Sequence, residues 1–337
     1  MISISVYRFR DLIRHVKGMR FAIIGDIMLD RYLWGSVNRI SPEAPVPIVD
    51  IESESSRLGG AANVANNIEA LGATPFLIGV VGSDSPGQTI KQLMEEKRFP
   101  TDGLIIDDGR PSSVKTRVIA HNQHVVRVDR ESREGISKTI TERICSVIEK
   151  NIHNFNGVIV QDYNKGLLIP DVIHYLNEIA RKNNTLITVD PKFHNFFEYQ
   201  NVTVFKPNQR ELELVLGKRF ATDDEFFETG KDVRERLHCK NLLITRGEKG
   251  MALFELDSKI TQIPTRAREI HDVSGAGDTV ISTLTLFLAC GATLLESAHL
   301  ANYAAGVVCG EVGVVPITIE KLEEAIIRDS AKVHQIM

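Results

Sequence analysis

Residues 272–278 combine a carboxylate, small residues and the start of an apolar helix in the order Asp-Val-Ser-Gly-Ala-Gly-Asp. Glycine at positions 275 and 277 lets backbone N–H groups converge on an anion, and the positive end of the following helix points to the same place. Asp278, in the first helical turn, is placed to take a proton from an attacking hydroxyl. The segment predicts a phosphoryl-transfer site. The alternative is an ordinary loop before a helix, and a short glycine motif alone does not decide between them.

Polar residues also follow the first predicted strand, residues 21–25. Asp26 and Asp30 are spaced so that one turn aims both at the same ligand, and carboxylates bind sugar hydroxyls by accepting hydrogen bonds. Residues 59–63, Gly-Gly-Ala-Ala-Asn, begin the next helix and permit a ligand to approach the backbone closely. The alternatives are a turn aspartate with a surface ion pair to Arg31, and small residues that serve helix packing.

Paired charges mark two later strand ends. Asp162 and Lys165 lie in the segment Gln-Asp-Tyr-Asn-Lys-Gly at 161–166, and Asp190 and Lys192 follow another strand. A surface salt bridge explains one such pair, but two pairs at two strand ends favour a shared binding site.

Two further segments have the composition of a nucleotide and metal site. Asn208 and Glu211 are three residues apart and share a helix face, which suits a hydrated Mg²⁺ ion with few direct protein ligands. A helix-capping role for Asn208 is compatible with this. Residues 245–250, Thr-Arg-Gly-Glu-Lys-Gly, form a tight turn that offers backbone groups and a cation to a nucleotide. A plain hairpin turn is the alternative.

The elements that must position these residues alternate between strand and helix. Apolar strands are predicted at residues 21–25, 76–81, 157–161, 185–189, 202–205 and 241–245, with helical stretches between them. This pattern predicts a mostly parallel sheet covered on both faces, with ligands at the carboxyl ends of its strands.

Two segments interrupt this alternation, at about residues 34–52 and 112–130. Both are extended and β-branched, and they predict a small β lid over the substrate. An exposed sheet of this kind also favours pairing with a second copy of the chain, so we expect a homodimer through the lid. Since no repeat or flexible linker marks a boundary, residues 1–337 are expected to form a single domain.

Composition excludes several classes of protein. The chain has 337 residues, 43% of them hydrophobic, enough for a large core, and a net charge of −4 without the Lys/Arg block of a nucleic-acid binder. Four widely spaced cysteines predict reduced thiols. No signal peptide is recognised and the longest apolar run, residues 280–290, is too short for a bilayer. We expect a cytoplasmic enzyme of small molecules that binds neither membrane nor nucleic acid.

The motifs at 59–63, 206–211 (Lys-Pro-Asn-x-x-Glu), 245–247 (Thr-Arg-Gly) and 272–278 together resemble the ribokinase-like (PfkB-type) carbohydrate kinases, over nearly the whole chain. The resemblance implies an α/β fold, a three-layer α/β/α arrangement with a mostly parallel central sheet plus a small β-sheet lid. Within that family, residues 25–32, 40–48 and 161–166 are similar to the kinases that act on D-glycero-β-D-manno-heptose 7-phosphate.

The resemblance implies a role for each matched position. Asp278 would be the catalytic base, and Gly275, Ala276 and Gly277 would form the anion hole for the γ-phosphoryl group. ATP would be bordered by Asn208, Thr245, Arg246, Gly247, Gly250 and Asn302, with Mg²⁺ held through water by Asn208 and Glu211. The sugar would be held by Asp26, Asp30, Gly59, Gly60 and Asn63, with Asp162 and Asp190 nearby. Candidates for its phosphate, chosen by charge and loop position, are Lys115, Arg117, Lys165 and Lys192.

The chain departs from the family pattern in two ways. Val273 and Ser274 replace the usual Thr-containing sequence beside Asp272, which leaves activation by a monovalent cation such as K⁺ open. A nucleotidyltransferase domain with a His-x-Gly-His signature, which follows the kinase in bifunctional relatives, is not found before Met337. The expected product is therefore a 1,7-bisphosphate that a separate adenylyltransferase uses for ADP-heptose and the lipopolysaccharide core.

Three other functions were weighed against this one. Another PfkB-type kinase would act on a hexose, a ribose or a nucleoside. A non-catalytic binder of sugar or nucleotide would have no use for the base Asp278. A dinucleotide dehydrogenase is disfavoured because no Gly-x-Gly-x-x-Gly follows the first strand.

Overall fold

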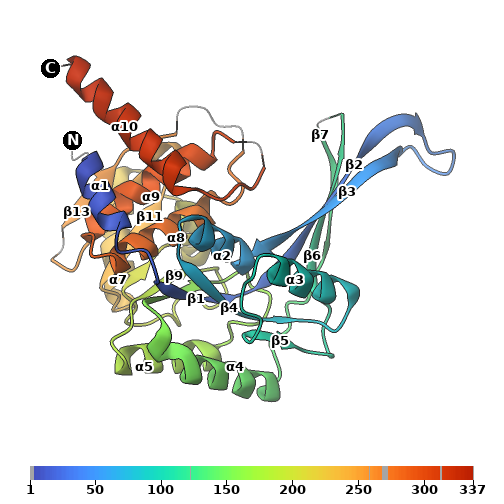
Figure 1. The fold of residues 1–337 in the computed structure, drawn as a ribbon, viewed down its shortest axis with the longest axis horizontal. Coiled ribbons are helices and arrows are strands. Elements are labelled where there is room, and N and C mark those ends of the chain that lie inside the picture. The colour runs from blue at the N-terminus through green and yellow to red at the C-terminus, as the bar shows by residue number, and fades with distance from the viewer. Residues whose placement is uncertain (1–3, 122, 258, 268–271, 312, 337) are drawn as a thin grey trace.

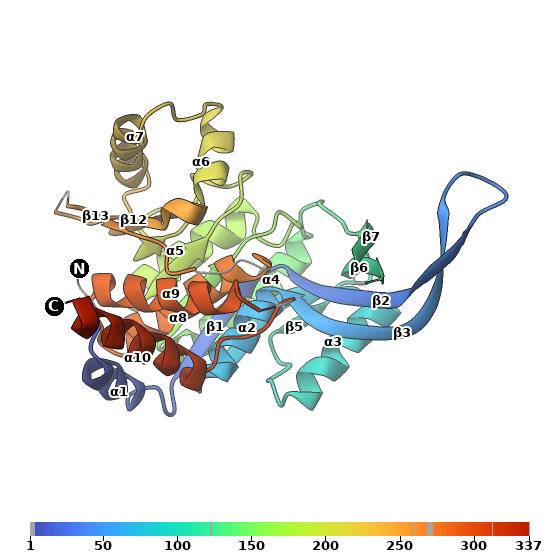
Figure 2. The same cartoon turned by 90° about the horizontal axis from the view of Figure 1, so that it is seen from above.

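The computed structural model describes residues 4–121, 123–257, 259–267, 272–311 and 313–336, the side chains of 331–336 excepted. Within these ranges the strands form a nine-stranded sheet of order β13-β12-β11-β10-β9-β8-β1-β4-β5 and a four-stranded sheet of order β3-β2-β6-β7. Figures 1 and 2 show the large sheet between two layers of helices, with the small sheet projecting from one side.

The strands of the large sheet are parallel from β5 to β11, whereas β12 and β13 at the edge are antiparallel. They are β1 (Arg20–Gly25), β4 (Thr74–Val81), β5 (Leu104–Ile106), β8 (Gly157–Gln161), β9 (Ile187–Asp190), β10 (Val204–Phe205), β11 (Asn241–Thr245), β12 (Met251–Phe254) and β13 (Ile260–Ile263). Every residue of β8 is buried, and so is every residue of β1 after Arg20, because helices cover both faces. The predicted α/β fold, with its mostly parallel central sheet, is confirmed.

Two apolar cores separate the sheet from its helices. On one face lie α1 (Val6–Ile13), α2 (Ala61–Ala70), α3 (Ser85–Glu96), α8 (Ala276–Ala289), α9 (Leu294–Val308) and α10 (Ile319–Ile336). On the other lie α4 (Lys138–Asn151), α5 (Pro170–Lys182), α6 (Gln209–Leu216) and α7 (Asp223–Arg236). None of the helices described is both long and apolar enough to cross a membrane. The four cysteines are free thiols, as the sequence predicted.

The small sheet consists of β2 (Ile27–Ile40), β3 (Pro47–Gly60), β6 (Ser113–Ala120) and β7 (Gln123–Arg130). The lid strands predicted at 34–52 and 112–130 are therefore present, but β2 and β3 extend further toward the large sheet than expected. Asp30 was expected in a turn after the first strand; it lies within β2, since β2 begins one residue after Asp26. Gly59 and Gly60 end β3, and the helix begins after them at Ala61.

The long hairpin of β2 and β3 joins the lid to the edge of the large sheet. Ile27 pairs with Gly60, and Asp30 pairs with Arg57 on one side and with Lys115 on the other. Several predicted substrate residues therefore lie at the base of the small sheet. The organisation of residues 1–337 as a single domain with a functional lid stays a prediction.

Candidate active site

Asp278 lies where α8 begins, above the carboxyl ends of the central strands. Gly275 is the N-cap residue of α8, and its φ of +79° is a left-handed conformation that favours glycine. The helix points its N-terminal backbone N–H groups at the place where β8, β9 and β10 end. Asp278 lies in the first turn of α8, as predicted, while the anion cradle formed by Gly275, Ala276 and Gly277 (below, the cradle) stays a prediction.

Both oxygens of the Asp278 carboxylate accept a hydrogen bond. Asn63 Nδ2 donates to Oδ2 at 2.7 Å and the Tyr163 hydroxyl donates to Oδ1 at 2.7 Å. Burial raises the pKa of Asp278 to about 6, although the two hydrogen bonds and Lys206 favour its ionised form and Asp190 opposes it. The carboxylate is therefore largely ionised at neutral pH, and its pKa suits proton transfer in that range.

A buried ion pair lies next to the cradle. Lys206 Nζ is 3.0 Å from Asp190 Oδ2, and both side chains are less than a tenth exposed. A Cβ atom placed on Gly277 would lie 3.6 Å from Asp190 Oδ2 and 3.8 Å from Lys206 Nζ. The N-terminus of α8 at Gly277 therefore lies directly beside both partners of this ion pair.

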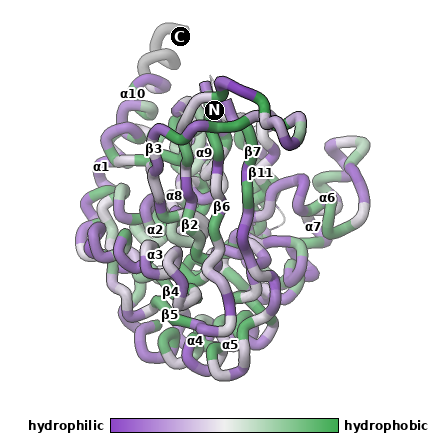
Figure 3. Tube along the Cα trace, turned by 90° about the vertical axis from the view of Figure 1, so that its right-hand side faces the viewer, coloured by the Kyte–Doolittle hydropathy of each residue, from purple (hydrophilic) through white to green (hydrophobic). Residues whose placement is uncertain are grey.

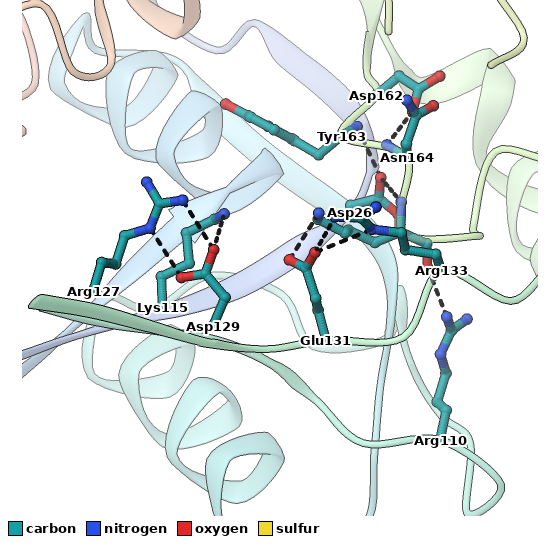
Figure 4. A network of polar contacts seen from close by, with 11 residues as sticks. Asp26, Arg110, Lys115, Arg127, Asp129, Glu131, Arg133, Asp162, Tyr163 and Asn164 are labelled. Carbon is teal, nitrogen blue, oxygen red and sulfur yellow. Dashed lines mark hydrogen bonds and ion pairs between the residues drawn. The ribbon is translucent and has the colours of Figure 1, made fainter. Parts of the chain in front are cut away.

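The Asp26 carboxylate accepts hydrogen bonds from backbone groups of the protein itself. Oδ2 accepts hydrogen bonds from the backbone N–H groups of Tyr163 at 2.8 Å and Lys165 at 3.1 Å, and Oδ1 accepts one from Leu167 at 3.4 Å. Figure 4 shows this carboxylate against the loop that follows β8. Burial raises the pKa of Asp26 while the three N–H donors lower it. Asp26 therefore orders the loop, and its contact with a sugar stays a prediction.

Asp30 faces the same region from the base of the lid. Its Oδ1 accepts a hydrogen bond from Arg117 Nη1 at 2.6 Å, and the Arg117 guanidinium lies 5.2 Å from the centre of the Tyr32 ring. A Cβ atom on Gly59 would collide with the Asp30 carboxylate, which explains why glycine occupies that position. Asp30, Gly59 and Arg117 thus lie together, although the sequence assigned Arg117 to the sugar phosphate and did not predict its pairing with Asp30.

The other cations proposed for a sugar phosphate are each paired with an acid. Lys115 Nζ is 3.7 Å from Asp129, and Lys165 Nζ is 2.7 Å from Glu131, both acids lying at or just after the end of β7 (Figure 4). Lys192 pairs with Glu211 instead, and its ammonium lies 5.6 Å from the centre of the Tyr163 ring. The structure brings Lys115 and Lys165 to one network and places Lys192 nearer the nucleotide side.

Asp162 is almost fully buried and also serves the protein itself. It accepts hydrogen bonds from Asn164 N at 2.7 Å and from the Tyr199 hydroxyl at 2.8 Å. Burial and the nearby Asp26 raise its pKa to about 6. These contacts indicate a structural role in shaping the loop, and its contact with substrate stays a prediction.

An elongated cavity of about 550 Å³ adjoins the cradle. Its lining is mostly apolar and includes Val273, Ala276, Gly277, Val280, Met251, Ala305 and Cys309, together with the predicted nucleotide residues Thr245, Gly247, Gly250 and Asn302. The Asn302 side chain donates to Pro264 O at 2.7 Å and so fixes one wall. An apolar cavity of this size that opens on an anion cradle suits a purine nucleoside with its phosphates directed at α8.

A larger groove, about 1220 Å³, shares Thr245 and Gly247 with this cavity and is also lined by Asn208 and Arg246. The Arg246 guanidinium is buried, donates to Asp223 at 2.6 Å and to Gln209 at 3.1 Å, and stacks on Phe226 at 3.9 Å. Arg246 therefore joins the predicted turn to α6 and α7. The turn itself is confirmed, since residues 247–249 connect the antiparallel strands β11 and β12.

Asn208 and Glu211 form a capping box at the start of α6. Asn208 Oδ1 accepts from Glu211 N at 2.8 Å, and Glu211 Oε2 accepts from Asn208 N at 2.9 Å. The other carboxylate oxygen of Glu211, Oε1, is paired with Lys192. Only the remaining lone pairs of the two oxygens are left to accept a hydrogen bond from a water molecule. In the described ranges no three His, Cys, Asp or Glu side chains are grouped to hold a metal, so these residues fit a hydrated Mg²⁺ better than a directly bound one.

Sequence reasoning missed three residues of this site: Tyr163, Lys206 and Glu131. Lys206 follows a predicted strand, and the rule that ligands gather at strand ends could have found it. Tyr163 lies within the quoted segment 161–166, but nothing in that segment indicates that its hydroxyl reaches Asp278, 115 residues further along the chain. Glu131 lies just beyond β7 and is recognised only through its contact with Lys165.

A covered, mostly parallel sheet, a carboxylate at a helix N-terminus and a small accessory sheet are the arrangement expected of a ribokinase-like sugar kinase. The family model of the pfkB family carbohydrate kinases matches residues 20–321. The chain belongs to this family, and it is accordingly a phosphotransferase that acts on a carbohydrate hydroxyl.

The curated relatives are bifunctional HldE proteins. That of Geobacter sulfurreducens is 42% identical over 303 residues, covering 90% of this chain and 62% of the relative. That of Paramagnetospirillum magneticum is 38% identical over 319 residues, covering 95% and 65%. The chain thus spans less than two thirds of the length of these relatives.

Solved structures agree on the fold. Phosphofructokinase-2 from Escherichia coli in complex with substrates and products superposes with a TM-score of 0.75 at 16% identity, covering 93% of this chain and 99% of the other. Arabidopsis thaliana ribokinase complexed with ribose and ATP gives 0.71 at 17% identity, covering 92% and 99%.

Replacing Asp26 tests its structural role. We expect Asp26→Asn to lower the free energy of unfolding by about 1–3 kcal/mol, because the new amide cannot accept all three backbone donors. Urea unfolding measures this, with Asp50→Asn on the exposed part of β3 as the matched control, expected to change stability by less than about 0.5 kcal/mol. Equal stability of the two variants would contradict the assignment.

Proposed function

We propose that this chain transfers the γ-phosphoryl group of ATP to the C1 hydroxyl of D-glycero-β-D-manno-heptose 7-phosphate, as a step toward ADP-heptose. The observation that carries the proposal is the buried Asp278 carboxylate between the cradle of α8 and the sugar-side residues Asn63 and Tyr163. The similarity of residues 25–32, 40–48 and 161–166 to heptose 7-phosphate kinases supports the acceptor, as do relatives that are HldE proteins.

In the proposed reaction Asp278 takes the proton of the C1 hydroxyl. The C1 oxygen then forms its bond to the γ-phosphorus while the bond between that phosphorus and the bridging oxygen breaks, releasing ADP. Backbone N–H groups at Gly275 to Gly277 and the α8 dipole stabilise the charge on the transferred group, with Lys206 beside them. Mg²⁺ would be held through water by Asn208 and Glu211 and would neutralise phosphate charge.

The sugar is proposed to lie between Asp30, Asn63 and the loop after β8, with the lid over it. Its 7-phosphate would then be near Lys115 and Lys165, which at present pair with Asp129 and Glu131. A phosphate carries more charge than a carboxylate and accepts from several donors, so it can replace these acids as the partner of the lysines. Arg117 would remain with Asp30, whose buried carboxylate needs it.

The sequence leaves the use of K⁺ by this chain open. A solved structure of Escherichia coli phosphofructokinase-2 is in complex with potassium. Here the Asp272 side chain accepts a hydrogen bond from Ser274 N at 2.8 Å, and residues 268–271 lie outside the described part. Activity measured with K⁺ and with Na⁺ as the sole monovalent cation decides whether the chain uses it.

We further propose that two copies of the chain associate through their lids. All of β7 is exposed, and the lid bears exposed apolar side chains at Trp34, Ile40, Val46, Ile51, Val125, Val126 and Val128. Apolar residues recur along the lid strands in Figure 3. Exposed edge strands with such side chains favour pairing with another sheet.

The substrate assignment is tested by ADP release from Mg-ATP with a panel of acceptors. We expect the highest kcat/KM with D-glycero-β-D-manno-heptose 7-phosphate, and a loss of at least about 100-fold for the same heptose without its phosphate, because that substrate makes no charged contact with the two lysines. Preference for ribose, fructose or a nucleoside would assign the chain to another branch of the family. Absence of turnover with every acceptor would favour a non-catalytic binder.

Asp278→Asn tests the base. We expect kcat to fall by roughly 10²–10⁴-fold because the amide cannot accept the proton, while the Kd for ATP changes by less than about 3-fold. Turnover and ATP binding are measured on the same preparation, with Asp232→Asn on the exposed side of α7 as the control. Near-normal turnover in Asp278→Asn would show that another group is the base.

The lid interface is tested by light scattering. The double variant Val126→Glu/Val128→Glu places two charges on one face of β7, since alternate residues of a strand share a face. We expect the mass to fall from twice 37.6 kDa to 37.6 kDa, whereas Leu256→Glu, at a side chain 69% exposed elsewhere, leaves it unchanged. A wild-type monomer would contradict the proposed dimer.

A further inference from the structure

The Tyr163 hydroxyl makes the shortest contact between the loop after β8 and the proposed base. It donates to Asp278 Oδ1 at 2.7 Å, while Asn63 donates to the other oxygen. The roles proposed for the glycines of the cradle and for the lysines do not explain why a tyrosine hydroxyl lies at this point. Its donor atom reaches the carboxylate from the loop that follows β8, whereas Asn63 reaches it from α2.

The tyrosine is held at both ends, so its hydroxyl has a defined position. Its backbone N–H donates to Asp26 at 2.8 Å, and the Lys192 ammonium lies 5.6 Å from the centre of its ring. Two residues on, Lys165 is fixed by its own backbone bond to Asp26 and by its ion pair with Glu131. The loop therefore holds the backbone of Tyr163 at Asp26 (Figure 4), while its hydroxyl donates to Asp278.

The chemistry of the phenol makes it a donor here. Burial next to the Asp278 carboxylate raises the pKa of Tyr163 well above its usual value, so the hydroxyl keeps its proton at all working pH values. A carboxylate has about four lone-pair sites, and Asn63 and Tyr163 occupy one on each oxygen. The remaining lone pairs are free to accept a proton, in a plane that the two donors fix.

We propose that Tyr163 is a positioning residue for the base: its hydroxyl orients the Asp278 carboxylate and holds it in the ionised form that accepts the sugar proton. The inference rests on the proposed role of Asp278. It assigns to the loop at 161–166 a residue that affects the chemical step through its hydrogen bond to Asp278.

The groups that face Asp278 from the surrounding elements set the direction of the expected effect. Asp190 at the end of β9 disfavours its charge, whereas Lys206 after β10, Asn63 on α2 and Tyr163 favour it; Lys192 is also near enough to interact. Removing the Tyr163 donor raises the pKa of Asp278 further. Because the ionised form is active, activity must then be lost preferentially at low pH.

The test is the pH profile of Tyr163→Phe, which keeps the ring, its contact with Lys192 and the backbone bond to Asp26. A hydrogen bond to a charged group corresponds to about one pKa unit or more, so we expect the acid midpoint of kcat/KM to rise by about one unit from the wild-type value near 6. At about pH 6 the loss is then roughly 5-fold, approaching about 10-fold at about pH 5, and at about pH 8.5 it is less than about 3-fold. The phosphate groups of the substrates titrate in the same way in the assays of both proteins. A difference between the pH profiles of the two proteins therefore comes from the enzyme.

Tyr199→Phe is the matched control. The Tyr199 hydroxyl donates at 2.8 Å to Asp162, another buried carboxylate with a pKa raised to about 6, but it does not touch Asp278. We expect this variant to lose stability and to keep the wild-type midpoint. ATP affinity and urea unfolding of each variant show whether it is folded.

The outcomes separate the two proposals. A pH-independent loss in Tyr163→Phe, or the same shift in Tyr199→Phe, would overturn the positioning role while a loss of turnover in Asp278→Asn still supports the base. Full turnover in Asp278→Asn would overturn the proposed base itself. An upward shift confined to Tyr163→Phe supports the inference.

Discussion

The hydrogen bonds from the loop after β8 to the Asp26 carboxylate are the interaction on which the site depends. Asp26 ends the turn between β1 and β2, and the three N–H groups that it accepts belong to a segment more than a hundred residues away. A buried carboxylate without such donors would be costly, so the loop and the aspartate stabilise each other. The bonded pair fixes the central strand, the start of the lid and the loop as one unit.

The same loop also connects Asp26 to two other parts of the structure. Through Tyr163 it reaches Asp278 on α8, and through Lys165 it reaches Glu131 beyond the last strand of the small sheet. The proposed base and the end of β7 therefore contact neighbouring positions of one short segment.

Much of the fold was predictable because the relevant signals are local. β1, β8 and β11 are apolar runs bounded by polar residues, the rule that ligands bind at strand ends drew attention to Asp190 and Asn208, and the glycine motif before a helix drew attention to Asp278. The structure of residues 27–33 was not predictable in this way. Their apolar and polar residues suit a turn or a strand equally, and pairing with β3 and β6 decides for the strand.

The side chains that pair with the buried charged groups were also not predictable from the sequence. Asp162 was grouped with Lys165 because they are three residues apart, yet Asp162 bonds to Tyr199 and Lys165 pairs with Glu131. Spacing along a loop gives no information on which distant side chain the fold brings close. The residue types at the site could be recognised from their order, whereas their division between structural and chemical roles follows from three-dimensional contacts.

The charge balance of the site explains why its cations are stable before a substrate arrives. Lys206, Lys165 and Lys115 each have a carboxylate partner, so none is buried as an isolated charge. The pair beside Gly277 differs from the others because it is nearly inaccessible to solvent, and neither partner can leave without exposing the other to an apolar surrounding. The two pairs at the small sheet are more exposed, and their acids belong to the region of β7. Under the proposed function, an anionic ligand exchanges with the acids at the lid, while the ion pair at the cradle keeps its geometry and contributes a fixed field to the chemical step.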